Sequence, residues 1–202
     1  MMAMMAMTSC IAQNENDFSS GNKTEVVEEI MMSRRSIRQY TDRKVERSTL
    51  DKILECGINA PNGQNRQAYE IRVVDDTLLL EDINAAVKKD NPQLNLADNP
   101  KTIFNDAPCV IFIANDTTYR VSQIDCGLLG ENIILSAWSR GIGSCCMAYP
   151  TMLMSESPSC KPIIDRLGFS QGYSLLYCIT IGYPAETPDA KQRRLDKIKY
   201  VE

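Results

Sequence analysis

Three arginines and a serine lie within five positions of the segment Ser33–Tyr40, which reads SRRSIRQY. The guanidinium groups of Arg34, Arg35 and Arg38 are planar and permanently charged, and their paired N–H donors match phosphate oxygens. Ser36 adds a neutral donor. The segment therefore favours a phosphorylated small molecule as its ligand, although a solvated basic surface at the end of a helix would have the same composition.

A second basic cluster occupies Lys191–Tyr200, KQRRLDKIKY. The whole chain carries 22 Lys and Arg residues against 26 Asp and Glu residues, a net charge of -4, so its positive charge is local. This balance gives no electrostatic case for nucleic acid or an anionic membrane as a partner. The two basic clusters could share one phosphate, or the second could be a solvated tail.

The chain contains no histidine. This excludes histidine-based metal sites and Ser-His-Asp or Cys-His nucleophiles, so we expect no metal site and assign no catalytic side chain. Redox or transfer chemistry would then belong to a cofactor. The eight cysteines show no Cys-x-x-Cys spacing, which predicts reduced and mostly structural thiols. Those within apolar runs are Cys56, Cys109, Cys126 and Cys178, and the adjacent Cys145 and Cys146 lie in a Gly-rich stretch.

The stretch Pro61–Gln67, PNGQNRQ, is rich in side-chain amides. A carboxamide can donate and accept hydrogen bonds at once, which suits the edge of a heteroaromatic ring. Turn formation explains the same composition without any ligand, and the residues alone favour that simpler interpretation.

Hydrophobic periodicity predicts helices and strands between these motifs. A helix with Thr24 as its N-cap presents the arginines at its C-terminal end, and a second helix is capped by Ser48 and ends before Pro61. The expected strands are Tyr69–Val74, Cys109–Ala114 and Ser174–Ile181; the other helices are Thr77–Lys89, Tyr119–Arg140 and Ser159–Leu167; the loops are Asn91–Ala107 and Gly141–Pro150.

The longest predicted helix, Tyr119–Arg140, has apolar residues nearly all the way round. Such a helix is buried in a core or in a subunit interface. Gly127 and Gly130 would let another backbone approach it closely. The GIGS sequence that follows, Gly141–Ser144, is no dinucleotide fingerprint, because a helix rather than a strand precedes it.

Residues 1–23 combine a short apolar run with a polar tract, and we expect them to be a disordered leader before a single domain at 24–202. The apolar residues before Cys10 are also typical of the end of a bacterial lipoprotein signal, which would make Cys10 the acylated residue. No stretch is long enough for a transmembrane segment. The cytoplasm is the favoured location, and membrane anchoring through Cys10 is the alternative.

Taken in order, five segments resemble the nitroreductase family of flavoproteins and span nearly the whole chain after residue 24. They are SRRSIRQY at Ser33–Tyr40, APNGQNRQAY at Ala60–Tyr69, SRGIGSCC at Ser139–Cys146, LGFSQGYSLLYCITIGYP at Leu167–Pro184 and KQRR at Lys191–Arg194. The resemblance implies an α+β fold, namely a three-layer α-β-α sandwich with a mixed, mostly antiparallel sheet. It also implies an intertwined homodimer with two FMN sites at its interface.

The resemblance assigns binding roles to residues at the matching positions. Those expected at the FMN phosphate and ribityl end are Arg34, Arg35, Ser36, Arg38, Lys191 and Arg193. Those expected at the isoalloxazine ring are Asn65 and Gln67, which also reach the ribityl chain, and Cys146, Met147 and Ala148, whose backbone donors would face flavin N5. The match leaves open whether Arg193 or Arg194 is the family's basic residue, and which subunit supplies each half of the phosphate site.

Two segments depart from the family pattern. Many members have Gln-Pro-Trp where this chain has Gln67-Ala68-Tyr69; a tyrosine can still pack there, so we expect flavin binding to survive. One branch of the family has a glutamate after the Gly-rich loop where this chain has Ala148, so the substrate range of that branch does not transfer.

The implied function is that of an FMN-dependent oxidoreductase. NADH or NADPH would reduce the flavin at N5, and an electron-poor small molecule such as a nitroaromatic or a quinone would take the reducing equivalents. The flavin would carry the chemistry, which agrees with the absence of histidine. The alternative is a non-catalytic protein of the same fold that binds flavin or another anion and is lipid-anchored through Cys10. A nucleic-acid module is disfavoured by the net charge.

Overall fold

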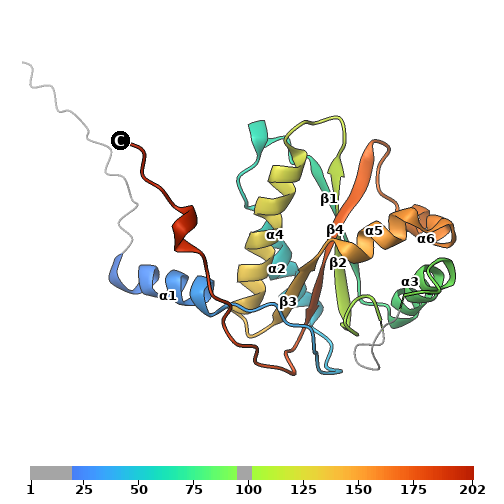
Figure 1. Cartoon of the computed structure of the whole chain (residues 1–202), viewed down its shortest axis with the longest axis horizontal. Coiled ribbons are helices and arrows are strands. Elements are labelled where there is room, and N and C mark those ends of the chain that lie inside the picture. The colour runs from blue at the N-terminus through green and yellow to red at the C-terminus, as the bar shows by residue number, and fades with distance from the viewer. Residues whose placement is uncertain (1–19, 95–101) are drawn as a thin grey trace, which may run out of the picture.

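A four-stranded antiparallel sheet lies between two layers of helices in the computed structural model, which describes residues 20–94 and 102–202 (Figure 1). The strand order is β1-β2-β4-β3. The strands are β1 Tyr69–Val74, β2 Cys109–Asp116, β3 Gly143–Met147 and β4 Tyr173–Gly182. The helices are α1 Ser20–Ser33, α2 Arg47–Ile58, α3 Thr77–Asp90, α4 Ser122–Trp138, α5 Tyr149–Glu156 and α6 Lys161–Leu167. Short 3-10 turns lie at Gly63–Asn65, Pro158–Cys160 and Leu195–Lys197.

The central strand β2 shows why the sheet is covered on both sides. Ile111 and Ile113 pack into an apolar cluster with α2 and α4, whereas Val110 and Phe112 pack into a second cluster with α3 and α5. Successive side chains of a strand point to opposite faces of the sheet. A continuous apolar run is therefore what a strand between two helical layers requires.

The predicted α+β class and the three layers agree with this structure, but the mixed sheet does not. Each pair of neighbouring strands is antiparallel. The parallel pairing is confined to an isolated bridge between Ser36 and Ser144, which ties the segment after α1 to the free edge of β3. The sheet is thus antiparallel throughout its four strands, because its parallel neighbour is too short to count as a strand.

Several predicted elements begin or end elsewhere. The helix expected after Thr24 extends back to Ser20, and α2 begins at Arg47 with Glu46 in the N-cap position, so neither Thr24 nor Ser48 is a cap. In α3 the N-cap is Asp76, whose side chain accepts a hydrogen bond from the backbone N–H of Leu78 at 3.0 Å.

Two segments predicted as loops contain buried structure. The stretch Gly141–Pro150 contains β3, which pairs with β4 over its whole length, and leads into α5. Its short Gly-Ser-Cys-Cys-Met sequence lacks the branched residues that mark the other strands. Phe104, in the predicted surface loop before β2, is 1% exposed and packs edge-on against Phe112. The prediction for residues 95–101 of that loop lies outside the described residues.

The helix α4 has one buried face and one open face. Leu129 and Ile133 are fully buried, whereas Ile124 and Leu128 are 64% and 42% exposed. Close approach occurs at Gly130, where a Cβ atom would lie 2.1 Å from the hydroxyl oxygen of Tyr177. A Cβ atom at Gly127 would meet nothing within 4 Å. An apolar stripe of α4 is therefore uncovered in the single chain.

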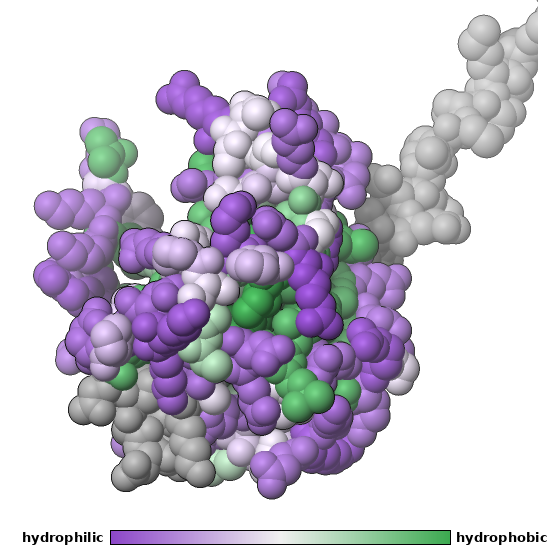
Figure 2. Space-filling view, turned by 90° about the vertical axis from the view of Figure 1, so that its right-hand side faces the viewer, coloured by the Kyte–Doolittle hydropathy of each residue, from purple (hydrophilic) through white to green (hydrophobic). Residues whose placement is uncertain are grey.

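Most of the exposed large apolar side chains belong to α1, α4 and the C-terminal segment. The helix α1 and the C-terminal segment lie at the left of Figure 1, beside α4. Figure 2 shows another face, which carries α3 and α6; hydrophilic residues cover most of it and surround a smaller apolar centre. The large side chains exposed on α1 and in the C-terminal segment are Val26, Val27, Met31, Met32, Leu195, Ile198, Tyr200 and Val201.

The seven cysteines in the described ranges are free thiols, and most of them are buried, as predicted for structural residues. Among the helices that the structure describes, none has the length and apolar composition needed to cross a membrane. The predicted acylation site, Cys10, and residues 1–19 lie outside the described part of the chain.

Candidate functional site

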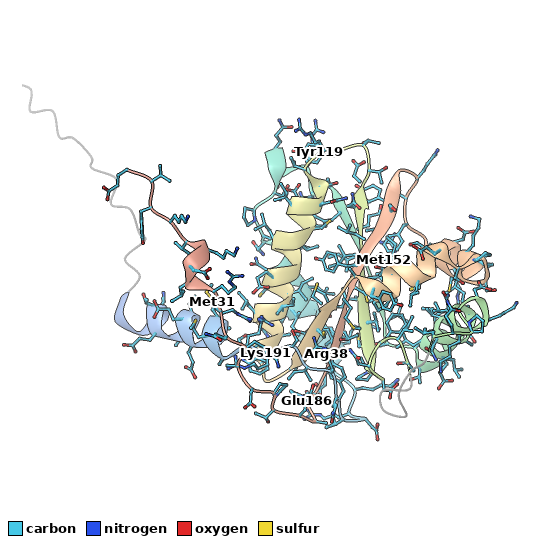
Figure 3. All side chains as sticks on the ribbon, viewed as in Figure 1. Met31, Arg38, Tyr119, Met152, Glu186 and Lys191 are labelled. Carbon is cyan, nitrogen blue, oxygen red and sulfur yellow. The ribbon has the colours of Figure 1, made fainter. Side chains whose placement is uncertain are left out.

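The two basic clusters of the sequence line one pocket of about 330 Å³ within a single chain. Figure 3 shows Arg38 and Lys191 beside each other near one end of α4. Arg194 points elsewhere and forms an exposed ion pair with Asp196 at 2.6 Å. The polar groups of the lining are Arg34, Arg35, Ser36, Arg38, Asp189, Lys191 and Arg193. We call this site the basic pocket.

The first half of the basic pocket is fixed to the sheet through Ile37. Its backbone N–H donates to the Ser144 carbonyl at 2.9 Å, and its fully buried side chain fills the space that a Cβ at Gly143 would occupy. The Tyr40 hydroxyl donates to the Ile37 carbonyl at 2.6 Å and lies 2.7 Å from the hydroxyl of Thr180. Burial raises the pKa of Tyr40, so the phenol stays neutral and keeps this hydrogen bond.

Arg35 differs from its neighbours because its guanidinium closes the end of α1. Its Nη1 donates to the carbonyls of Met32, Ser33 and Arg34, each at 2.9 Å. The last carbonyls of a helix lack partners within the helix, and a cation there is also favoured by the helix dipole. Arg35 therefore stabilises the turn that presents Arg34 and Ser36.

The second half of the basic pocket is joined to the first by Glu186, which sequence reasoning missed. One oxygen of the Glu186 carboxylate, Oε1, accepts hydrogen bonds from the backbone N–H groups of Arg38 and of Gln39, the latter at 3.2 Å. Two backbone bonds support it: Ala185 N–H donates to the Gln39 carbonyl and Thr41 N–H to the Tyr183 carbonyl, each at 2.9 Å. This pairing sets the course of the chain after Glu186, which brings Lys191 and Arg193 to the basic pocket.

The segment Cys146–Ala148 lies next to the basic pocket, where β3 leads into α5. The bridge from Ser36 reaches β3 at Ser144, and Cys146 follows about 7 Å further along the strand. Cys146 is exposed on the outer edge strand of the sheet, and Ala148 is exposed as well. The guanidinium groups are close enough to act on β3: burial raises the pKa of the Cys145 thiol, and the charges of Arg38 and Arg34 oppose that rise.

The amides of Asn65 and Gln67 are not brought to the basic pocket. They belong to the loop Asn62–Gln67, here called the amide loop, which meets α4 at its opposite end. The amide loop contacts Asp125 in the first turn of α4, whereas Ser33, just before the arginines, accepts a hydrogen bond from Trp138 Nε1 at 2.8 Å in the last turn. These two positions are about 20 Å apart along the helix. Figure 3 likewise shows Tyr119, which stacks on Arg66 of this loop, far from Arg38 and Lys191.

The amide loop has a strained backbone. Gln64, Asn65 and Gln67 have φ angles of 56°, 53° and 49°, in the left-handed region. This conformation costs a non-glycine residue on the order of 1 kcal/mol. The Gln67 N–H donates to Asn62 Oδ1 at 2.9 Å across the loop, and the Asn65 and Gln67 side chains are exposed. The loop thus holds its amides outward, in a shape that its own sequence does not favour.

The sequence model described as Nitroreductase family matches residues 31–183. The chain belongs to the nitroreductase family. The matched range contains the arginines, the amide loop and the segment Cys146–Ala148, and Lys191 and Arg193 lie just beyond it. The family match thus spans most of the described fold and three of the four candidate segments, without assigning a role to any of their residues.

Two archaeal relatives cover most of the chain. A protein of Methanothermobacter thermautotrophicus, provisionally named NADH dehydrogenase/NAD(P)H nitroreductase, is 28% identical over 183 residues, which are 84% of this chain and 83% of the relative. A protein of Archaeoglobus fulgidus with the same provisional name is 26% identical over 166 residues, covering 79% of this chain and 86% of the relative.

A solved nitroreductase with bound FMN from Desulfitobacterium hafniense is similar in fold, with a TM-score of 0.78 and 28% identity, over 87% of this chain and 98% of that one. A nitroreductase with bound FMN from Bacteroides fragilis gives a TM-score of 0.77 and 25% identity over the same shares of the two chains.

Proposed function

We propose that this chain is an FMN-dependent oxidoreductase that passes reducing equivalents from NADH or NADPH to an electron-poor small molecule such as a nitroaromatic or a quinone. The observation that carries the proposal is the basic pocket, in which residues about 150 positions apart in the sequence meet within one chain. The two FMN-bound structures that the chain resembles support the choice of cofactor.

The donor set of the basic pocket fits a phosphate monoester. Arg34 and Arg38 offer paired N–H donors, Ser36 offers a hydroxyl, and Lys191 and Arg193 add charge from the C-terminal segment. We infer that these residues bind the FMN phosphate, and that Arg35 mainly holds the turn. The neighbouring Cys146–Ala148 would place backbone N–H donors beside the flavin ring.

We further propose that each flavin site combines the basic pocket of one copy with the amide loop of a second copy. Within one chain the two parts lie at opposite ends of α4, so a ligand held in the basic pocket would meet the amides of Asn65 and Gln67 only on another subunit. The uncovered apolar stripe of α4 with Ile124 and Leu128, and the exposed apolar residues of the C-terminal segment, give a second copy a surface to bury.

When bound, FMN supplies hydride acceptance and donation at N5, and this chemistry requires no side-chain acid or base. The chain would contribute binding, orientation and a surface for the electron acceptor. Tyr149 and Met152, one turn apart at the start of α5 and 60% and 54% exposed, would form an apolar wall beside Ala148. Figure 3 shows Met152 in front of the sheet, between α4 and α6.

Anaerobic visible spectra test the proposed activity. Purified protein supplied with FMN should retain a yellow chromophore that either NADH or NADPH bleaches and that a nitroaromatic or quinone restores. Protein that stays colourless after incubation with FMN would refute the flavin proposal. A yellow protein that neither nicotinamide bleaches would show flavin binding without the proposed catalysis, as expected of a non-catalytic binding protein of this fold.

A further inference from the structure

The amide loop is hydrogen-bonded to α4 through Gly63. The backbone N–H of Gly63 donates to Oδ1 of Asp125 at 3.0 Å. A side chain at this position would have to displace Tyr119, because a Cβ atom would lie 2.2 Å from the hydroxyl oxygen of Tyr119 and 3.2 Å from Val121. Glycine therefore lets the loop backbone come close enough to the helix for its N–H to reach the carboxylate.

Asp125 is placed in an unusual way for a carboxylate. The residue is 3% exposed, and its second oxygen, Oδ2, is buried without a hydrogen-bond partner among the residues that the structure describes. Burying an unpaired carboxylate oxygen opposes folding. A neutral acceptor would serve stability better, since buried charges are seldom the most stabilising choice. The position in the first turn of α4 reduces the penalty, because the helix dipole favours negative charge there.

A charged acceptor offers a stronger bond to a single N–H than a neutral one does. The amide loop needs such a bond, because three of its residues adopt left-handed backbone conformations while their amides project into solvent. A loop without an anchor would relax toward commoner conformations and redirect those amides. The position, burial and unpaired oxygen of Asp125 thus indicate that this carboxylate is needed to keep the amide loop in its conformation.

We propose that Asp125 is a positioning residue that, through the N–H of Gly63, holds the amide loop in shape for the ring end of a bound flavin. This inference rests on the proposed function, because it takes the ring of FMN as the ligand of the loop. Asp125 would act on contacts to the ring, which riboflavin shares with FMN, whereas the basic pocket would act on contacts to the phosphate, which riboflavin lacks.

The test compares FMN and riboflavin binding to the full chain, by quenching of flavin fluorescence, for the wild type, Asp125→Ala and Asp125→Asn. We expect Asp125→Ala to weaken both ligands by the same factor, about tenfold or more, because one charge-assisted bond is lost. Asp125→Asn keeps an oxygen that can accept from Gly63 but loses the charge, so it should weaken both ligands by the same factor and by less than Asp125→Ala does. A merely structural role would leave both affinities unchanged well below the melting temperature.

Gly63→Ala provides a second variant if Asp125→Ala does not fold. It displaces the amide loop from Tyr119 and leaves Asp125 intact, so it should weaken both flavins equally. Adding Tyr119→Phe removes the hydroxyl oxygen that the new Cβ atom at position 63 would meet, and this should restore part of the lost affinity.

Three results would overturn the role of Asp125 while leaving the proposed function in place: wild-type affinities in Asp125→Ala, a loss confined to FMN, or equal losses in Asp125→Ala and Asp125→Asn. Unchanged riboflavin binding in Gly63→Ala would also overturn it. A wild-type protein that binds neither flavin would instead refute the proposed function itself.

Discussion

Glu186 should control the affinity of the basic pocket without touching its ligand. Its carboxylate accepts two backbone N–H groups, from Arg38 and Gln39, and so joins the segment of Lys191 and Arg193 to the segment of the arginines. A hydrogen bond to a charged group contributes about 1.5–3 kcal/mol. Glu186 is half-buried, so we take the same range for both bonds together, which predicts that Glu186→Ala weakens FMN binding roughly 10- to 100-fold.

The assay is FMN titration followed by fluorescence quenching, combined with a double-mutant cycle. If Glu186 acts through the C-terminal segment, Glu186→Ala should cost nearly nothing more in a chain that already carries Lys191→Ala and Arg193→Ala, since interacting sites are not additive. The backbone bonds of Tyr183 and Ala185 remain in all these variants, which keeps the rest of the fold intact.

Two controls separate this attachment from simple charge effects. Glu186→Gln retains an oxygen that can accept both N–H groups and should keep an affinity within about threefold of the wild type. Asp189→Ala removes a carboxylate from the pocket lining and should leave binding equal or tighter. Additive losses in the cycle, or unchanged binding in Glu186→Ala, would show that Glu186 does not act through the C-terminal segment.

Three further predictions concern the pocket, the core and acid stability. Arg34→Ala should weaken FMN binding about 10- to 100-fold and leave riboflavin binding and thermal stability unchanged, and equal losses for both flavins would contradict a phosphate role. In α4, Gly130→Ala should destabilise the chain by about 1–3 kcal/mol in urea because Tyr177 must move, whereas Gly127→Ala should not; equal effects would be inconsistent with the packing. Hydrogen bonds from Arg43 and Tyr183 lower the pKa of Glu46 from 4.5 to about 2, so its stabilisation is present above pH 4.5 and lost as the pH falls toward 2. In Glu46→Gln, the urea concentration at the unfolding midpoint should therefore depend less on pH between these values. The same pH dependence as in the wild type would count against this.

The elements predicted correctly from the sequence are those whose own residues favour the conformation, whereas elements that depend on distant partners were missed. β1 has the predicted bounds, Tyr69–Val74, and the buried run that begins at Cys109 forms the centre of the sheet. By contrast β3 is stabilised by its partner β4 and has little strand propensity of its own. The burial of Phe104 likewise depends on Phe112, which local pattern does not reveal.

The candidate site divides in the same way. The arginines, Ser36 and the C-terminal basic residues are visible in the sequence because charge clusters are local, and the structure brings them to one pocket. Glu186 carries no sequence signal, since it acts on backbone N–H groups almost 150 positions away. Asp125 is an acidic residue in a mainly apolar helix, and its proposed role depends on the backbone N–H of Gly63, which no sequence pattern indicates.

The separation of the basic pocket from the amide loop could not be predicted from either motif alone. Both were expected at one flavin, and each chain places them at opposite ends of α4. This separation along α4 is the reason we propose that a second subunit completes the site.

A mixed dimer tests most directly whether two copies build each flavin site. One copy, with its own affinity tag, carries Arg34→Ala and Arg38→Ala; the other, with a different tag, carries Asn65→Ala and Gln67→Ala. Purified through both tags, the dimer has one site with both halves altered and one with both halves intact. If two copies build each site, the mixed dimer should hold one tightly bound FMN, bleached by NADH or NADPH, and either parent almost none. A mixed dimer without bound FMN, although the wild type binds it, would show that both halves act within one chain and that the site is not shared between two copies.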